Sequence, residues 1–245
     1  MSRRRGLLGV AGRCAAMAAL LLFSWSALQE NAGAAVITSL PTKDRVVALT
    51  FDACEANAPA HLDHAIANYL VQNRIPFTVF MAGKFARANA ADARWLASFP
   101  FVDIENHSFS HNDHMDRMTP EQVRQEVIGA QQEIQQITGR RTHFFRFPAG
   151  NYSPAGLSEV ESLGYRVVHW RWPVGDPDPK VSALRIERAV GEMTRPGDIL
   201  IMHINGRGWH TGEALPHVVA ELRARGYRFV TISDALPSAR TTPIA

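Results

Sequence analysis

Seven short runs rich in Val, Ile, Phe and Tyr recur along the chain, and segments with helical periodicity separate most of them. Several runs are apolar almost throughout, which is typical of parallel strands that are covered on both faces. Alternation of such strands with helices predicts a parallel α/β protein. The runs are VVALTF (46–51), FTVFMA (77–82), FVDIEN (101–106), HFFRF (143–147), YRVVHW (165–170), DILIMH (198–203) and YRFVTI (227–232).

Two of the intervening segments show the helical pattern clearly. Apolar residues keep helix spacing over residues 62–70 and again over residues 123–137. Thr119 and Gln122 precede the second segment with the spacing of a capping box, and Gly139 follows it as a C-terminal stop. The sequence therefore predicts amphipathic helices that pack against the sheet.

Both a doubly wound sheet and a (β/α) barrel fit this alternation. No GxGxxG motif or P-loop follows the first run, which disfavours the nucleotide-binding forms of the doubly wound sheet. A barrel predicts unusual polar residues just past the carboxyl ends of its strands. Such residues are present, so we predict a distorted, incomplete (β/α)7-type barrel with parallel strands. They are Asp52, His107, Arg146, Asp176 and His203.

The first 34 residues have the pattern of a secretory signal peptide. A basic start, MSRRRGLLGV, precedes the apolar stretch AAMAALLLFSWSAL, and Ala32-Gly33-Ala34 has the small-residue spacing of a cleavage site. An uncleaved anchor is the alternative, although the apolar stretch is short for a bilayer span; Ser2-Arg3-Arg4 also resembles a twin-arginine signal. We expect residues 35–245 to form one exported domain, periplasmic or secreted, without a stable membrane span after cleavage.

Signal removal changes the charge and the cysteine count of the mature chain. Residues 1–34 hold four Arg and one Glu, so their loss takes the formal net charge from +3 to zero. A chain without a net basic footprint is not expected to bind nucleic acid. Cys14 leaves with the signal, so Cys54 has no partner for an intramolecular disulfide.

Five motifs together resemble a known family. TFD (50–52), HSFSH (107–111), RFPAG (146–150), WRWPVGD (170–176) and IMH (201–203) stand in the order and spacing of the NodB-type polysaccharide deacetylases, carbohydrate esterase family 4. The resemblance covers residues 44–236. It implies a metal-assisted hydrolase that removes acetyl groups from an N-acetylated glycan, such as peptidoglycan or a chitin-like oligosaccharide, and less commonly from O-acetylated xylan.

The histidines of HSFSH are the candidate metal ligands. Taken alone, His107 and His111 could be two solvated histidines in a loop, but the five ordered motifs favour a metal clamp. Neutral imidazoles suit a divalent cation such as zinc. A cation that keeps one open position lowers the pKa of a bound water and polarises a carbonyl.

The resemblance also assigns the proton-transfer residues. It implies that Asp52 is the general base, with Arg146 holding it ionised. His203 would be the general acid, and Asp176 would orient it, with Asp178 as a competing position. From the residues alone, Asp52 could instead be a helix N-cap, Arg146 a surface ion-pair partner, and His203 a core histidine.

Four residues are candidates for the substrate side of the site. The backbone N–H of Ala149 could stabilise an oxyanion, since Pro148 has no N–H to offer. Trp170 and Trp172 alternate along a strand, so they could belong to the core, or one of them could line a sugar groove.

The chain departs from the family pattern beside Asp52. The resemblance implies a second aspartate there as the third metal ligand, but the sequence has Ala53, which cannot ligate. Asp52 could move onto the metal, Glu55 or Cys54 could substitute, or water could fill the position. If Asp52 ligates, another base is needed, and His210 is a spare candidate. Loss of a ligand also leaves open two other functions: an exported glycan-binding pseudoenzyme, and a hydrolase of non-glycan amides.

Overall fold

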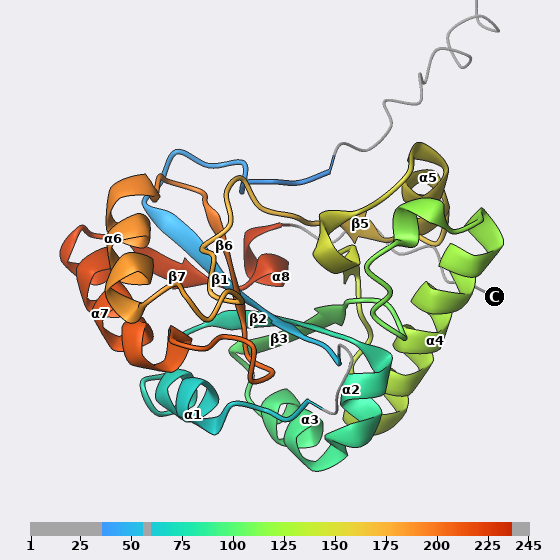
Figure 1. Ribbon diagram of the computed structural model, residues 1–245, viewed down its shortest axis with the longest axis horizontal. Coiled ribbons are helices and arrows are strands. Elements are labelled where there is room, and N and C mark those ends of the chain that lie inside the picture. Colours follow the sequence, from blue (N-terminus) through green and yellow to red (C-terminus); the bar gives the residue numbers. More distant parts are fainter. Residues whose placement is uncertain (1–35, 56–59, 237–245) are drawn as a thin grey trace, which may run out of the picture. The chain divides into compact units, whose positions relative to one another are not determined.

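The computed structural model describes residues 36–55 and 60–236 (Figure 1). The predicted signal peptide, residues 1–34, lies outside the described residues. Within the described ranges, no helix is both long enough and apolar enough to cross a membrane.

A parallel sheet forms the centre of the domain, and all seven predicted strands are confirmed. Six strands follow one another in the order β5-β4-β3-β2-β1-β6. The first residues of β1 pair with β7 and its last residues pair with β2. The strands are β1 (Val46–Ala53), β2 (Phe77–Met81), β3 (Val102–Asn106), β4 (Phe144–Phe145), β5 (Arg166–Val167), β6 (Ile199–His203) and β7 (Arg228–Val230).

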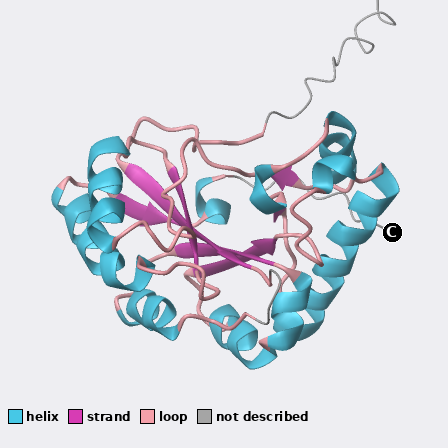
Figure 2. Cartoon of the chain, in the orientation of Figure 1, coloured by secondary structure: helices cyan, strands magenta, loops and turns pink. Residues whose placement is uncertain are grey.

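Helices line the outside of this curled sheet, which confirms the predicted incomplete barrel (Figure 2). In Figure 1, α6, α7, α1, α3, α2 and α4 follow one another in an arc around the strands. The helices are α1 (His64–Gln72), α2 (Gly83–Ala88), α3 (Ala90–Ala97), α4 (Pro120–Thr138), α5 (Pro154–Ser162), α6 (Ala183–Met193), α7 (Thr211–Ala224) and α8 (Ile232–Ala235). The predicted capping box of Thr119 and Gln122 opens α4, and Gly139 ends it at a φ of 72°.

The two faces of β1 have different surroundings. Alternate residues from Val47 to Phe51 pack with side chains of the outer helices, including Ile66 of α1 and Leu215 of α7. The residues between them face a separate inner cluster. Its members are Leu40, Val46, Ala48, Phe80, Phe144, Val168, Ile199, Ile232 and Leu236.

The inner face of β1 becomes polar toward its carboxyl end. Successive strand residues point to opposite faces, so Thr50 and Asp52 continue the face that begins with Val46 and Ala48. The apolar inner cluster therefore lies beneath a polar layer at the ends of the strands. Phe80 marks the boundary, because its ring centroid lies 4.0 Å from the guanidinium carbon of Arg146.

We expect Phe80→Ala to lower the free energy of unfolding by about 3–5 kcal/mol, because it leaves a cavity in the closed inner cluster. Phe229→Ala is the matched control, since Phe229 is only partly buried at the sheet edge and should cost less. Denaturant titration of both variants measures the difference. Equal losses of unfolding free energy in the two variants would contradict the placement of Phe80 in a closed inner cluster.

Candidate active site

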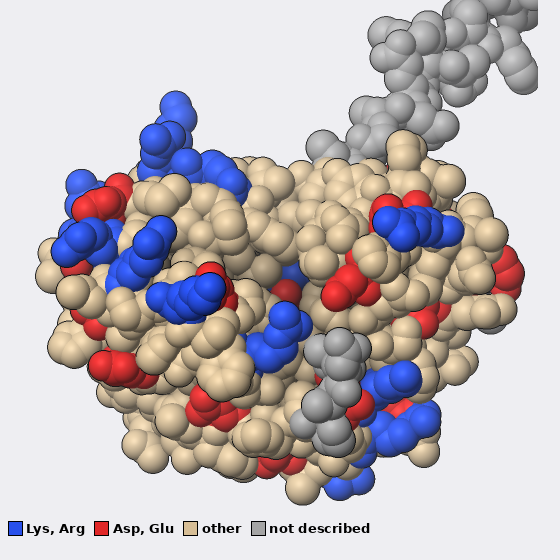
Figure 3. Space-filling view, viewed as in Figure 1, with Lys and Arg blue, Asp and Glu red and all other residues tan. Residues whose placement is uncertain are grey.

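A cavity of about 220 Å³ lies at the carboxyl ends of the strands. Figure 3 shows a hollow near the centre of one face, with acidic and basic side chains inside it. Six of the predicted site residues line the cavity, although they come from separate parts of the chain. They are Asp52, His111, Ala149, Trp170, Asp176 and His203.

A buried ion pair between Asp52 and Arg146 forms the floor of the site. Nη1 of Arg146 donates to Oδ1 of Asp52 at 2.7 Å, and Nη2 donates to Oγ1 of Thr50 at 2.9 Å. Nε of the same guanidinium donates to the carbonyl of Val168 at 3.2 Å. The Arg146 side chain is fully buried. It is therefore a component of the inner core rather than a surface ion-pair partner.

The environment of Asp52 keeps its carboxyl ionised. Burial raises the pKa of this carboxyl group, but His107 and Arg146 together lower it by more. The resulting pKa is about 2. Asp52 is at the end of β1 and the structure gives it no helix-capping role. A carboxylate is thus available in the cavity throughout the neutral pH range.

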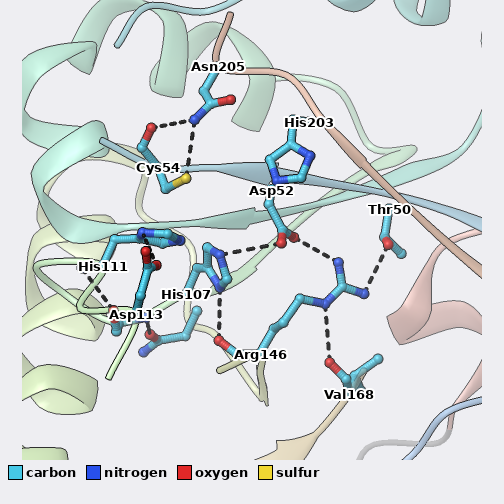
Figure 4. A network of polar contacts seen from close by, with 12 residues as sticks. Thr50, Asp52, Cys54, His107, His111, Asp113, Arg146, Val168, His203 and Asn205 are labelled. Carbon is cyan, nitrogen blue, oxygen red and sulfur yellow. Dashed lines mark hydrogen bonds and ion pairs between the residues drawn. The ribbon is translucent and has the colours of Figure 1, made fainter. Parts of the chain in front are cut away.

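His107 is oriented by a backbone carbonyl. Its Nδ1 lies 2.8 Å from the carbonyl oxygen of Arg146, which can only accept, so Nδ1 carries the proton. Nε2 is then the unprotonated nitrogen. It has no hydrogen-bond partner among the described residues, and lies 3.4 Å from Oδ2 of Asp52 (Figure 4). Burial lowers the pKa of His107, so the imidazole is neutral, as a metal ligand must be.

His111 faces His107 from the same loop. The two ring centroids are 4.8 Å apart. Burial, and secondly the electrostatic interaction with the neighbouring His107, lower the pKa of His111 to about 3. Nδ1 of His111 lies 3.4 Å from the Asp113 carboxylate, which is exposed at the cavity mouth.

Polar contacts hold the HSFSH loop in a strained turn. Ser108 and His111 both have positive φ, 64° and 54°, a conformation that costs free energy in residues with a side chain. The Glu126 carboxylate of α4 accepts from the N–H groups of Phe109 and Ser110 and from the Ser110 hydroxyl, at 2.7–2.9 Å. Glu126 thereby fixes the loop that carries both histidines.

The donor set at this end of the cavity fits a divalent cation. Ligand atoms of Cys54, His107 and His111 all lie within 4.8 Å of one another. The unpartnered, buried Nε2 of His107 is costly unless a ligand occupies it. Two neutral imidazoles with a sulfur beside them suit zinc or a metal of similar preference.

A second polar pair occupies the opposite wall. Nδ1 of His203 lies 3.0 Å from Oδ1 of Asp176. Oδ2 of Asp176 accepts from the His203 N–H at 2.7 Å and from the Thr211 hydroxyl at 2.8 Å. A Cβ at Gly208 would meet the His203 carbonyl at 2.5 Å and this carboxylate at 3.1 Å, so the close packing requires glycine. The structure thus pairs Asp176 with His203, rather than the competing Asp178.

The candidate substrate residues divide between the cavity and the core. Trp170 lines the cavity, as does Ala149, which has a φ of 52° in the turn Pro148–Gly150. Pro148 is buried in that turn. Trp172 is a correction: it belongs to the outer hydrophobic core, and its Nε1–H donates to Asp198 at 3.2 Å. Both tryptophans follow the end of β5 in an irregular segment, where strand alternation does not apply, and they have different surroundings.

Some features of the site were not predicted from the sequence. Arg207 and Asp113 line the cavity; their positions in the Gly-rich loop after β6 and two residues after His111 were the available signals. Glu126 gave no signal, because its role depends on contact between α4 and a distant loop. His210, the spare base, does not line the cavity and lies 3.7 Å from Glu213.

Sequence comparison identifies the family to which these features belong. The family described as polysaccharide deacetylase matches residues 39–168, more than half of the chain. The chain belongs to the polysaccharide deacetylase family. The predicted resemblance is therefore confirmed.

Curated and solved relatives agree with this assignment. The peptidoglycan-N-acetylmuramic acid deacetylase PdaA of Bacillus subtilis is 29% identical over 205 residues, 80% of this chain and 73% of the relative. A family 4 acetyl xylan esterase from Clostridium thermocellum, solved with a cobalt ion, is 29% identical with a TM-score of 0.69, covering 78% and 89%. A CE4 family pseudoenzyme from Bacillus anthracis shares the fold, with a TM-score of 0.75 at 20% identity, covering 86% and 72%.

We expect Arg146→Met to lower the free energy of unfolding by about 3–5 kcal/mol at neutral pH, because it leaves the Asp52 charge buried without its partner. Arg117→Met is the control, since the Arg117 side chain is 73% exposed, and should change stability by no more than about 0.5 kcal/mol. Urea titration measures both. A small loss in Arg146→Met would mean that water or another cation replaces the guanidinium.

The same variant should respond to pH with a defined sign. In the wild type, the pKa of Asp52 lies below its ordinary value, so the pairing stabilises the fold above about pH 4 and is lost as pH falls through about 2. Without Arg146, burial raises the pKa of Asp52, and protonation relieves the buried charge. The stability deficit of Arg146→Met should therefore shrink between pH 7 and pH 4. A deficit that is constant over this range would contradict the assignment.

Proposed function

We propose that the protein hydrolyses the acetyl amide of an N-acetylated glycan, with a divalent metal ion, expected to be zinc, held by His107 and His111. Membership of the polysaccharide deacetylase family makes removal of acetyl groups the expected chemistry. The observation that carries the proposal is the Nε2 atom of His107, which has no hydrogen-bond partner among the described residues and lies 3.4 Å from Asp52. Asp52 and His203 both line the cavity. Hydrolysis of an O-acetyl ester is the less favoured form of the same reaction.

Asp52 would take the proton of the attacking water. Its carboxylate is ionised and lies at the cavity floor, but a pKa of about 2 makes it a weak base. A bound divalent cation lowers the pKa of water and polarises the acetyl carbonyl, which would allow such a weak base to serve. Arg146 would keep Asp52 in place and keep its carboxyl group ionised in the resting enzyme.

His203 would donate a proton to the departing nitrogen as the C–N bond breaks. Asp176 accepts from Nδ1, which leaves Nε2 as the nitrogen that exchanges the proton. The pair would also stabilise the imidazolium form before transfer. Asp52 and His203 therefore have opposite roles across one cavity. Ala149 lies where its backbone could contact the acetyl oxygen, and Trp170 offers an aromatic face to a sugar ring.

The relatives favour a cell-wall or similar glycan as substrate. PdaA acts on peptidoglycan N-acetylmuramic acid, as its name states, and the chain covers most of its length. Relatives in Bacillus cereus are named peptidoglycan-N-acetylglucosamine deacetylases. A secretory signal in residues 1–34 would deliver the protein to this substrate, in the periplasm or outside the cell. A chitin-like oligosaccharide carries the same N-acetyl group and is an alternative substrate.

A glycan-binding pseudoenzyme is the second candidate. Ala53 is the observation that favours it, because the expected third metal ligand is absent and the position is fully buried within the outer core. The retained pairs Asp52–Arg146 and His203–Asp176 favour catalysis, since binding alone does not require proton-transfer groups.

Acetate release from N-acetylated glycans, with and without a chelator, tests the proposal. We expect the zinc-loaded protein to release acetate, and Asp52→Asn and His203→Ala to lower kcat by about 10²–10⁴-fold. His210→Ala is the matched control and should keep wild-type activity, because His210 lies outside the cavity lining. Glycan binding without acetate release by the zinc-loaded wild type would instead establish the pseudoenzyme.

A further inference from the structure

We propose that Sγ of Cys54 is the third protein ligand of the metal, so that this chain has a Cys/His2 site where Ala53 leaves no donor. The inference rests on the metal centre of the proposed function. The expected ions are those that accept a thiolate together with imidazoles, namely zinc and cobalt(II), in preference to magnesium or manganese.

The placement of the three donors is the first argument. Cys54 follows the last residue of β1, and its ligand atom lies within 4.8 Å of those of His107 and His111. Figure 4 shows the sulfur and both rings on the same side of Asp52. Metal–ligand lengths of about 2.1 Å for nitrogen and 2.3 Å for sulfur bring tetrahedral donors to roughly 3.5 Å apart, so small side-chain rotations close the site.

The unsatisfied Nε2 of His107 is an independent observation. This atom is buried, unprotonated and without a hydrogen-bond partner among the described residues. His107 and Cys54 belong to the same group of potential metal ligands. A cation shared by His107 and Cys54 satisfies it, whereas a purely structural thiol leaves it unexplained.

The other candidates for the third position fit less well. Oδ1 of Asp52 is bound by Arg146 at 2.7 Å, and coordination of the metal through Oδ2 would take up the carboxylate that the proposed reaction needs as its base. Glu55 is farther along the chain and only half-buried. A thiolate also supplies one negative charge, which is the charge of the aspartate that Ala53 replaces.

The surroundings of the sulfur suit a ligand. The buried Asn205 amide donates to the Cys54 carbonyl and lies 3.2 Å from Sγ. A donor at a metal-bound thiolate orients the sulfur and stabilises its charge. The amide thereby ties the end of β1 to the loop after β6.

Cobalt(II) spectroscopy of the purified protein tests the ligand directly. A cobalt–thiolate bond gives a sulfur-to-metal charge-transfer band in the near ultraviolet, which nitrogen and oxygen ligands do not give. We expect this band in the wild type and in His210→Ala, which removes a potential ligand outside the cavity lining. Cys54→Ser should lose it. A cobalt-loaded wild type without the band overturns the proposal, even where Cys54→Ser fails to fold.

Zinc affinity provides the second measurement. Cys54→Ser and Cys54→Ala should each weaken zinc binding at least about tenfold, the smallest effect common for groups that support a metal site. Wild-type protein should prefer zinc to manganese, and Cys54→Asp should reduce that preference. Unchanged zinc affinity in folded Cys54→Ser would overturn the assignment.

These readouts separate the inference from the proposed function. A charge-transfer band without acetate release from any glycan keeps Cys54 as a ligand and removes the deacetylase. Acetate release by a cobalt-loaded protein without the band keeps the deacetylase and removes Cys54 from the metal.

Discussion

The buried pairing of Asp52 with Arg146 is the constraint on which the site depends. A guanidinium with no exposed surface needs a charged partner and hydrogen bonds to compensate for its burial. Its Nε, Nη1 and Nη2 each donate one hydrogen bond, to side chains of β1 and to the Val168 carbonyl beyond β5. The two strands lie on opposite parts of the curled sheet. Arg146 therefore closes the inner core with a polar layer, and the same contacts keep the Asp52 carboxyl ionised.

The remaining groups are arranged around this layer by short connections. The backbone carbonyl of Arg146 sets the tautomer of His107, so one residue orients both the candidate base and a candidate metal ligand. β6 pairs with β1 with His203 opposite Asp52, and this register brings the candidate acid to the same cavity. The strain in the HSFSH loop is compatible with stability because Glu126 fixes its backbone. The register of the sheet thus positions Asp52 and His203, and the loops add to this arrangement.

The sequence contains enough information for the strands and much of the site. Apolar runs predicted every strand because both faces of the sheet are covered, and strand ends predicted Asp52, His107 and His203 because parallel strands share a carboxyl edge. Trp172 could not be assigned, since the chain after β5 is irregular and its side chains do not follow strand alternation. Helices α2 and α3, at 83–88 and 90–97, are short and lack a strong apolar period. Glu126 and Asn205 act through long-range contacts that no local pattern reveals.

Ala53 stands where the family pattern has an aspartate, and the proposed Cys54 ligand would supply a different donor at the same end of the site. Ala53 packs within the outer core, where its methyl group offers no donor to a metal. In the proposed site, a ligand one residue later would reach the metal from the turn after β1, where the ligand atom of Cys54 lies within 4.8 Å of those of both histidines. Asp52 can then remain with Arg146, which preserves the base. Exchange of a carboxylate for a thiolate conserves the charge of the ligand set but replaces a hard donor with a soft one. In this proposal the Cys54 thiolate would determine which cations the site accepts, while the Asp52–Arg146 pair would keep a carboxylate available to take a proton.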